Sequence, residues 1–212
     1  MYMKIKTAEE KIFFLPAALL FLHCGCIIIL PPAAMPCRRN TVFGGDCKMK
    51  TLYFIGGAMG VGKTAASREL KTMLQDSVLL DGDNLWDMHP FTVDEDTKKC
   101  VISNIVACLS NFLACPRFKN IIFCWVLHQN EIAEYILSRL NLQGVRVVQI
   151  SLLCSEHTLL KRLNGDIAAG IRKKDVRARS AAYLPLYADL PTIKVDTERL
   201  TPREVAEVIA DL

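Results

Sequence analysis

Residues 57–64 contain three glycines, a lysine and a threonine at a spacing that suits the binding of phosphate groups. The stretch reads Gly-Ala-Met-Gly-Val-Gly-Lys-Thr and matches the pattern G-x-x-x-x-G-K-S/T. In such a loop the main-chain amides point at the anion, Lys63 reaches the β- and γ-phosphates, and the Thr64 hydroxyl ligates Mg²⁺. The pattern predicts a nucleoside triphosphate site made of Gly57, Ala58, Met59, Gly60, Val61, Gly62, Lys63, Thr64 and Ala65.

The residues on either side supply the elements that this loop requires. Residues 51–55 are apolar, with aromatic and β-branched side chains that are typical of a buried strand. Residues 64–74 place apolar side chains at helical spacing among good helix formers. A helix that begins at the last glycine adds the positive end of its dipole to the site. This context favours a phosphate loop over a glycine-rich turn that matches by chance.

Two carboxylates, Asp81 and Asp83, follow the next apolar run at residues 77–80 and flank Gly82. In an open parallel sheet, ligands lie beyond the carboxyl ends of the strands, so both carboxylates are expected beside the phosphate loop. We assign Asp81 to the outer shell of the metal and Asp83 to the proton of a substrate hydroxyl, although the two roles are exchangeable. The alternative is an ordinary Asp-Gly turn.

Aromatic and imidazole side chains follow two of the expected strands. Trp86 and His89 come shortly after Asp83. Trp125 lies near the end of an apolar run at residues 120–126, and His128 follows that run. We expect all four to face the acceptor together with Asp83. The alternatives are rim packing for the tryptophans and a structural role for the histidines, which is the commoner role of a histidine near a strand end.

The segment 162–179 combines two glycines with a cluster of cations, as in mobile lids that close over phosphates. Glycine permits a hinge, and arginine offers two-pronged contacts to phosphoryl oxygens. We expect Arg162 and Arg172 to act in catalysis and Arg179 to bind substrate. The alternative is a solvated basic helix face, and it applies most to Lys173 and Lys174.

Strand and helix patterns alternate along the remaining sequence. Further strands are expected at residues 145–153 and 192–196, and further helices at 97–113, 131–140 and from 156 onward. A last helix begins after Thr201, with Glu204 as the partner in a capping box. Five strands with intervening helices predict one α/β domain over residues 49–212.

Residues 1–48 differ in character from the remainder. They hold six Lys/Arg against three Asp/Glu, whereas residues 49–212 are nearly neutral, which argues against a nucleic-acid partner. Residues 12–30 are apolar and long enough to cross a bilayer. Because Met49 stands two residues before the first strand, we interpret residues 1–48 as an over-extended start. The alternatives are a membrane anchor and a secretory signal peptide.

Five cysteines lie in the second part, at positions 100, 108, 115, 124 and 154. Their spacing is not that of a zinc site. Several lie within apolar runs, which predicts buried free thiols in a reducing cytoplasm.

These motifs resemble those of the small-molecule P-loop kinases, which include shikimate kinases, gluconate kinases and chloramphenicol phosphotransferases. The resemblance covers residues 49–212 and is carried by residues 57–64, 81–83, 162–179 and 195–197. The Trp-Asp-Met-His-Pro-Phe sequence after Asp-Gly-Asp also looks like that of uncharacterised bacterial P-loop kinase-like ATPases.

The resemblance implies a three-layer α/β/α P-loop NTPase fold, with a five-stranded parallel sheet in the order 2-3-1-4-5 and a lid segment. It places Asp196 and Thr197 near the adenine and Arg162 and Arg172 in the lid. One departure is that residues 125–128 contain no Asp for a Walker B role and no glycine-rich substrate loop like that of shikimate kinases. Magnesium then depends on Thr64 and the carboxylates at 81 and 83, and shikimate is disfavoured as the acceptor.

The sequence thus predicts an ATP- and Mg²⁺-dependent kinase that transfers the γ-phosphoryl group to a small-molecule acceptor that bears a hydroxyl or a phosphate group. Lys63, Mg²⁺ and a lid arginine stabilise the developing charge, while Asp83 orients or deprotonates the acceptor. The competing class is a nucleotide-binding regulatory ATPase or switch without an acceptor. We expect a cytoplasmic monomer or homodimer, which meets a membrane only if residues 12–30 are a real anchor.

Overall fold

The computed structural model describes residues 49–212, so the expectations for residues 1–48 lie outside the described residues. Five parallel strands form one sheet in the order β2-β3-β1-β4-β5. The strands are β1 (Lys50–Gly57), β2 (Ser77–Asp81), β3 (Asn120–Cys124), β4 (Val145–Leu153) and β5 (Ile193–Asp196). The predicted fold class and strand order are confirmed.

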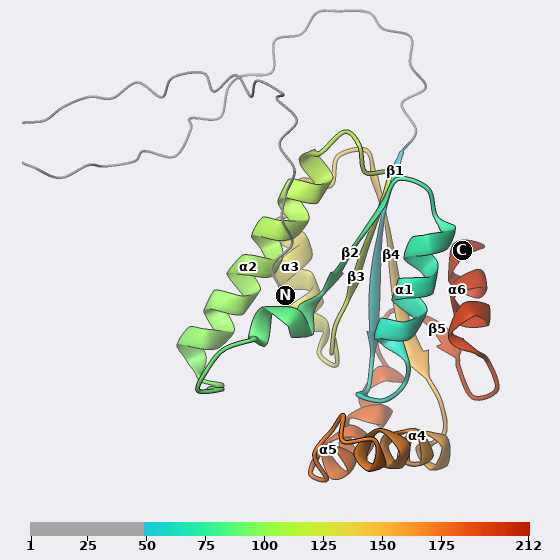
Figure 1. The fold of residues 1–212 in the computed structure, drawn as a ribbon. Coiled ribbons are helices and arrows are strands. Elements are labelled where there is room, and N and C mark those ends of the chain that lie inside the picture. Colours follow the sequence, from blue (N-terminus) through green and yellow to red (C-terminus); the bar gives the residue numbers. More distant parts are fainter. Residues whose placement is uncertain (1–48) are drawn as a thin grey trace, which may run out of the picture. The chain divides into compact units, whose positions relative to one another are not determined.

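Helices cover both faces of this sheet (Figure 1). Helices α2 (Glu95–Ala114) and α3 (Asn130–Ser138) lie on one face, and α1 (Lys63–Met73) and α6 (Pro202–Ala210) lie on the other. Two more helices, α4 (Glu156–Ala168) and α5 (Val176–Tyr183), lie at the edge where the strands end. Two short 3₁₀ turns complete the elements, namely η1 (Gly82–Trp86) and η2 (Leu184–Tyr187).

The central strand β1 is buried on both faces, which explains its unbroken apolar sequence. Leu52 and Phe54 pack into the core beneath α2 and α3. Tyr53 and Ile55 face the opposite core, which α1, α4 and α6 cover. This packing fixes the carboxyl end of β1, so that the loop between β1 and α1 starts from a rigid support.

The ends of two helices show how local sequence sets their boundaries. The capping box of α6 is present, since the Glu204 amide donates to Thr201 Oγ1 at 3.3 Å and the Thr201 amide donates to Glu204 Oε2 at 2.7 Å. Helix α2 begins at Glu95, two residues before the predicted start. The reason is that the Asp94 carboxylate accepts the Thr97 amide at 2.8 Å and caps the helix earlier.

The five cysteines of the described part are free thiols. Cys124 is buried, as predicted, but Cys100 is exposed because it lies beside the buried stripe of α2 and not in it. Within residues 49–212, no helix is both long enough and apolar enough to cross a membrane.

Candidate functional site

The loop between β1 and α1 has a backbone that favours glycine at three positions. Gly57, Gly60 and Gly62 have φ values of +150°, +87° and +109°, which other residues rarely adopt. Gly62 is the N-cap of α1, and within the described residues no side chain caps the first turn of this helix. The first intrahelical bond runs from the Ala66 amide to the Gly62 carbonyl, so the amides before Ala66 have no intrahelical acceptor. Amides of this kind, at the positive end of a helix dipole, suit the binding of an anion.

Lys63 lies inside the curve of this loop. Its ammonium donates to the Gly57 carbonyl at 2.8 Å and to the Ala58 carbonyl at 2.9 Å, and the side chain is only 7% exposed. Burial lowers the pKa of Lys63 to about 8, while the nearby Asp83 carboxylate opposes the shift. A buried ammonium held by two weak partners is well suited to exchange them for phosphate oxygens.

Thr64 and Asp81 join the loop to the end of β2. The Thr64 hydroxyl donates to Asp81 Oδ2 at 2.7 Å, and Asp81 Oδ1 accepts the Asp83 amide at 3.1 Å. A hydroxyl beside a carboxylate offers the hard oxygen ligands that Mg²⁺ prefers. Residues 49–212 contain no cluster of three or more His, Cys, Asp or Glu side chains around one point.

Cys124 occupies the end of β3, where the sequence lacks an aspartate. It pairs in register with Asp81, and burial raises the pKa of its thiol to about 12. Cys124 therefore remains a neutral thiol, and the carboxylate next to Thr64 comes from β2, one strand further along the sheet.

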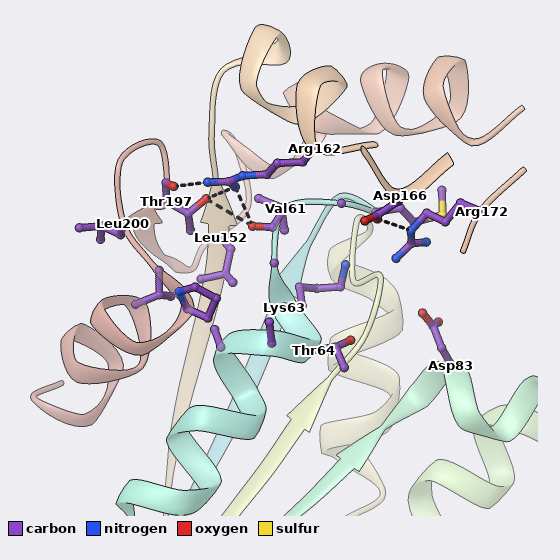
Figure 2. Close-up of a pocket in the computed structure, with 17 residues that line it drawn as sticks. Val61, Lys63, Thr64, Asp83, Leu152, Arg162, Asp166, Arg172, Thr197 and Leu200 are labelled. Atoms are coloured by element: carbon purple, nitrogen blue, oxygen red, sulfur yellow. Dashed lines mark hydrogen bonds and ion pairs between the residues drawn. The ribbon is translucent and has the colours of Figure 1, made fainter. Parts of the chain in front are cut away.

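A cavity of about 390 Å³ extends from this loop across the sheet edge (Figure 2). Its lining consists of residues 59–66 together with Asp83, Leu152, Arg162, Asp166, Arg172, Thr197, Leu200, Pro202 and Val205. One end is polar and holds Lys63, Asp83 and Arg172. The other end is mostly apolar, with Leu152 and Leu200. The apolar end was not predicted from the sequence. The strand order does indicate it, because the ends of β4 and β5 lie on the side of β1 next to the phosphate loop.

The two arginines expected to act in catalysis lie at opposite ends of this cavity (Figure 2). Arg162 donates to the Val61 carbonyl at 3.1 Å and to the Thr197 hydroxyl and carbonyl at 3.0 and 2.6 Å. These bonds tie α4 to the phosphate loop and hold Arg162 away from Asp83. The structure therefore places Arg162 at the apolar end of the cavity, and its expected role in catalysis stays a prediction.

Arg172 lies at the polar end, on the side of Asp83 (Figure 2). Its Nε donates to Asp166 Oδ2 at 3.0 Å, and both side chains are about one-third exposed. Asp166 was not predicted, although it lies within the glycine-bearing segment that suggested a lid. Asp83 remains open to the cavity, yet the protein packed around it raises its pKa, against the opposing effect of Lys63 and Arg172.

A comparison with protein families supplies the deciding observation. A family described as AAA domain matches residues 54–182, which include the phosphate loop, both aspartates and the lid segment. The chain belongs to this AAA domain family. A comparison with curated protein sequences found no match.

Solved structures with the same fold as this AAA domain include three proteins with informative names. The tunicamycin resistance protein of Deinococcus radiodurans is 21% identical, with a TM-score of 0.59 over 76% of this chain and 94% of that one. A gluconokinase from Sinorhizobium meliloti is 13% identical, with a TM-score of 0.55 over 76% and 89%. A shikimate kinase from Acinetobacter baumannii, solved with shikimate, is 18% identical, with a TM-score of 0.53 over 77% and 92%. The AAA domain therefore has the fold of the P-loop kinases, as the resemblance in sequence implied.

The remaining predicted site residues of the AAA domain lie outside the lining of the cavity. The indole of Trp125 packs against Gly82, and a hydrogen bond from its side chain partly opposes the rise in the pKa of Asp83 that burial causes. The rings of Trp86 and Phe91 are 6.3 Å apart, and His89 is exposed. The expected roles of Trp125, Trp86 and His89 in acceptor binding therefore stay predictions.

Three further predicted residues are engaged elsewhere in the AAA domain. His128 stacks on Tyr183 with ring centroids 4.3 Å apart. Arg179 forms an exposed ion pair with Asp175 at 3.6 Å. The exposed Asp196 carboxylate accepts the Glu198 amide at 2.8 Å, whereas its neighbour Thr197 lines the cavity and is almost fully buried.

Replacing Gly60 by alanine is expected to weaken nucleotide binding and to destabilise the AAA domain. A Cβ at this position would lie 2.6 Å from Leu163 Cδ2 and 2.8 Å from Leu163 Cγ, and Leu163 is fully buried. Overpacking of this kind costs about 1–3 kcal/mol. The control is Gly144→Ala, because Gly144 also has positive φ, +70°, but no atom lies within 4 Å of the place that its new methyl group would take. Urea unfolding and nucleotide titration of both variants measure the difference, and equal losses in the two would contradict the prediction.

Proposed function

We propose that this protein transfers the γ-phosphoryl group of ATP, with Mg²⁺, to a hydroxyl group of a small-molecule acceptor. The observation that carries the proposal is the polar end of the cavity. There Lys63 and Arg172, two cations, share one space with Asp83, whose carboxylate remains accessible. Phosphoryl transfer needs positive charge at the transferred group and a proton acceptor beside it, and this arrangement supplies both.

The reaction follows from these positions. Asp83 accepts the proton of the acceptor hydroxyl, and the freed oxygen forms a bond to the γ-phosphorus. The bond between this phosphorus and the β,γ-bridging oxygen breaks, and ADP leaves with the electron pair. The raised pKa of Asp83 makes its carboxylate a better proton acceptor than an ordinary aspartate.

The remaining parts of the cavity would bind the nucleotide. The main-chain amides of residues 59–65 would hold the phosphates, and the apolar end beside Leu152 and Leu200 would hold the base. Thr64 and Asp81 would hold Mg²⁺, which supplies charge neutralisation at the phosphates. Asp81 already faces the Thr64 hydroxyl at 2.7 Å, which supports this assignment.

The comparisons support a small-molecule acceptor. The gluconokinase and the shikimate kinase are kinases of small molecules by name, and both share the fold. We infer a cytoplasmic enzyme, since ATP is the donor, and a monomer or homodimer that needs no nucleic-acid partner.

An acceptor screen that follows ADP release tests the proposal. The purified protein is incubated with ATP and Mg²⁺, with and without each member of a panel of hydroxyl compounds. We expect at least about tenfold stimulation by one chemical class, because a positioned base is effective only when its substrate is bound. Slow ADP release that is indifferent to every acceptor would favour the competing interpretation, a regulatory nucleotide switch.

A further inference from the structure

Two of the chain segments beside Asp83, those that follow β2 and β3, contain no lysine or arginine, although each holds one histidine, His89 or His128. Residues 82–94, from η1 to the cap of α2, hold three aspartates and no lysine or arginine. Residues 125–130, which follow β3, hold no lysine, arginine, aspartate or glutamate. Both segments leave the sheet at its carboxyl edge, where β2 and β3 are neighbours (Figure 1). An acceptor that approaches Asp83 from this side meets negative charge or none.

Aromatic rings accompany the aspartates in the same place. Trp86, Phe91 and Trp125, which we name the aromatic cluster, lie on or beside η1, the element that carries Asp83. Trp125 packs so closely on Gly82 that an added Cβ would lie 2.6 Å from its Cγ. Phe91, 6.3 Å from the Trp86 ring, is 67% exposed. An exposed ring next to a functional site provides a surface for an aromatic or apolar part of a ligand.

The cations that line the cavity already have partners or face the phosphates. Arg162 is bound to Val61 and Thr197 at the apolar end. Lys63 lies within the phosphate loop, and Arg172 pairs with Asp166. An anionic group on the acceptor would therefore lie near carboxylates and would find no free lysine or arginine to pair with. Binding of such an acceptor is unfavourable.

We propose that the acceptor is an uncharged or cationic hydroxyl compound with an aromatic or apolar face, and that phosphorylated and carboxylated compounds are excluded. The inference rests on the proposed function, because it takes Asp83 as the point that the acceptor hydroxyl approaches. It restricts the charge of the acceptor and the kind of surface that the acceptor presents, neither of which the phosphate loop specifies.

Matched glycosides test the charge preference. Phenyl β-glucoside, phenyl β-glucosaminide and phenyl β-glucuronide share a ring, hydroxyl groups and a phenyl group, but they are neutral, cationic and anionic. Trp86 and Trp125 are the chain's only tryptophans, so their fluorescence reports on binding at this place without any turnover. We expect the change in tryptophan fluorescence to reach half of its maximum at concentrations of the neutral and cationic probes that are at least about tenfold lower than the concentration required of the glucuronide. Equal or tighter binding of the glucuronide would overturn the inference.

Small ions measure the same property without an acceptor. Each ion's quenching constant is first divided by its value for free N-acetyltryptophanamide. At constant ionic strength, this normalised quenching of the tryptophans is expected to be at least about twofold stronger for caesium than for iodide, because a negative potential concentrates cations. Asp87→Lys, an exposed position in the acidic segment, should lower this ratio, whereas Asp211→Lys at the end of α6 makes the same charge change elsewhere and should not. If no glycoside binds, this ratio decides, and normalised iodide quenching equal to that of caesium rejects the inference.

The outcomes separate this inference from the proposed function. Selective binding of neutral or cationic probes without ADP release supports the acceptor class and counts against phosphoryl transfer. ADP release stimulated only by anionic compounds supports phosphoryl transfer and rejects the acceptor class.

Discussion

Replacing Lys63 by methionine is expected to lower nucleotide-dependent turnover at least about 100-fold while leaving the fold intact. Removal of one preorganised donor to a developing negative charge typically costs 10²- to 10³-fold in rate. Methionine keeps the length and most of the apolar stem of lysine but has no ammonium. The measurement is ADP release at saturating ATP, together with a nucleotide titration that shows how much affinity is lost.

The stability of this variant distinguishes a functional lysine from a structural one. Burial lowers the pKa of Lys63 from 10.5 to about 8, so its charge costs the folded state roughly 3 kcal/mol below pH 8. Between pH 8 and 10.5 the unfolded state binds more protons, so wild-type stability rises with pH through this window. Lys63→Met removes this charge and so gains stability, but it also loses the hydrogen bonds from the ammonium to the Gly57 and Ala58 carbonyls. That loss offsets about 1–3 kcal/mol of the gain in the free energy of unfolding.

We therefore expect Lys63→Met to be as stable as the wild type at neutral pH, or more stable. Any such advantage should shrink between pH 8 and 10.5. Lys71→Met is the control, since Lys71 is an exposed lysine in the last turn of the same helix. It should leave turnover unchanged within about twofold. A loss of several kcal/mol in Lys63→Met would show that the ammonium holds the loop together and would contradict the functional assignment.

The sequence predicted the fold well because its signals are local and repeated. Each strand is a run of apolar residues, and the loop at 57–64 needs no distant information to adopt its shape. The fourth strand was predicted with the observed bounds, Val145–Leu153. Boundaries shifted where a cap lay outside the apolar pattern, as at Asp94, whose carboxylate starts α2 before the first periodic residue.

The candidate site was only partly predictable because several of its contacts join distant segments to main-chain atoms. Arg162 donates to the carbonyl of Val61, 101 residues away. Because every residue has a main-chain carbonyl, the sequence does not show which one accepts this bond. The pairing of Arg172 with Asp166, and the stack of His128 on Tyr183, depend likewise on how the lid segment folds over the sheet edge. Residue chemistry identified the arginines, but only the fold separates the one at the apolar end from the one beside Asp83.

Replacing Asp83 by asparagine is expected to lower acceptor-dependent phosphoryl transfer about 10²- to 10⁴-fold, the usual contribution of a positioned general base. Nucleotide affinity should change little, because asparagine keeps the shape of the side chain and removes the charge that faces Lys63. In the wild type, turnover should fall on the acid side at a pH above the usual range of an aspartate, since the pKa of Asp83 is raised and only its ionised form accepts a proton. Single-turnover assays across pH, with bound ATP in excess of acceptor, measure both effects.

The matched control for this substitution is Asp211→Asn, an exposed carboxylate at the end of α6. It removes the same charge without touching the cavity, so turnover should stay within about twofold of the wild type. The acid limb of the pH profile should persist in Asp211→Asn and be absent from the residual activity of Asp83→Asn. If Asp83→Asn turned over at the wild-type rate, the base would have to be another group. Phosphoryl transfer would then rest on the cations of the polar end alone, because Asp83 is the only carboxylate of the cavity lining, within residues 49–212, that is not paired with an arginine.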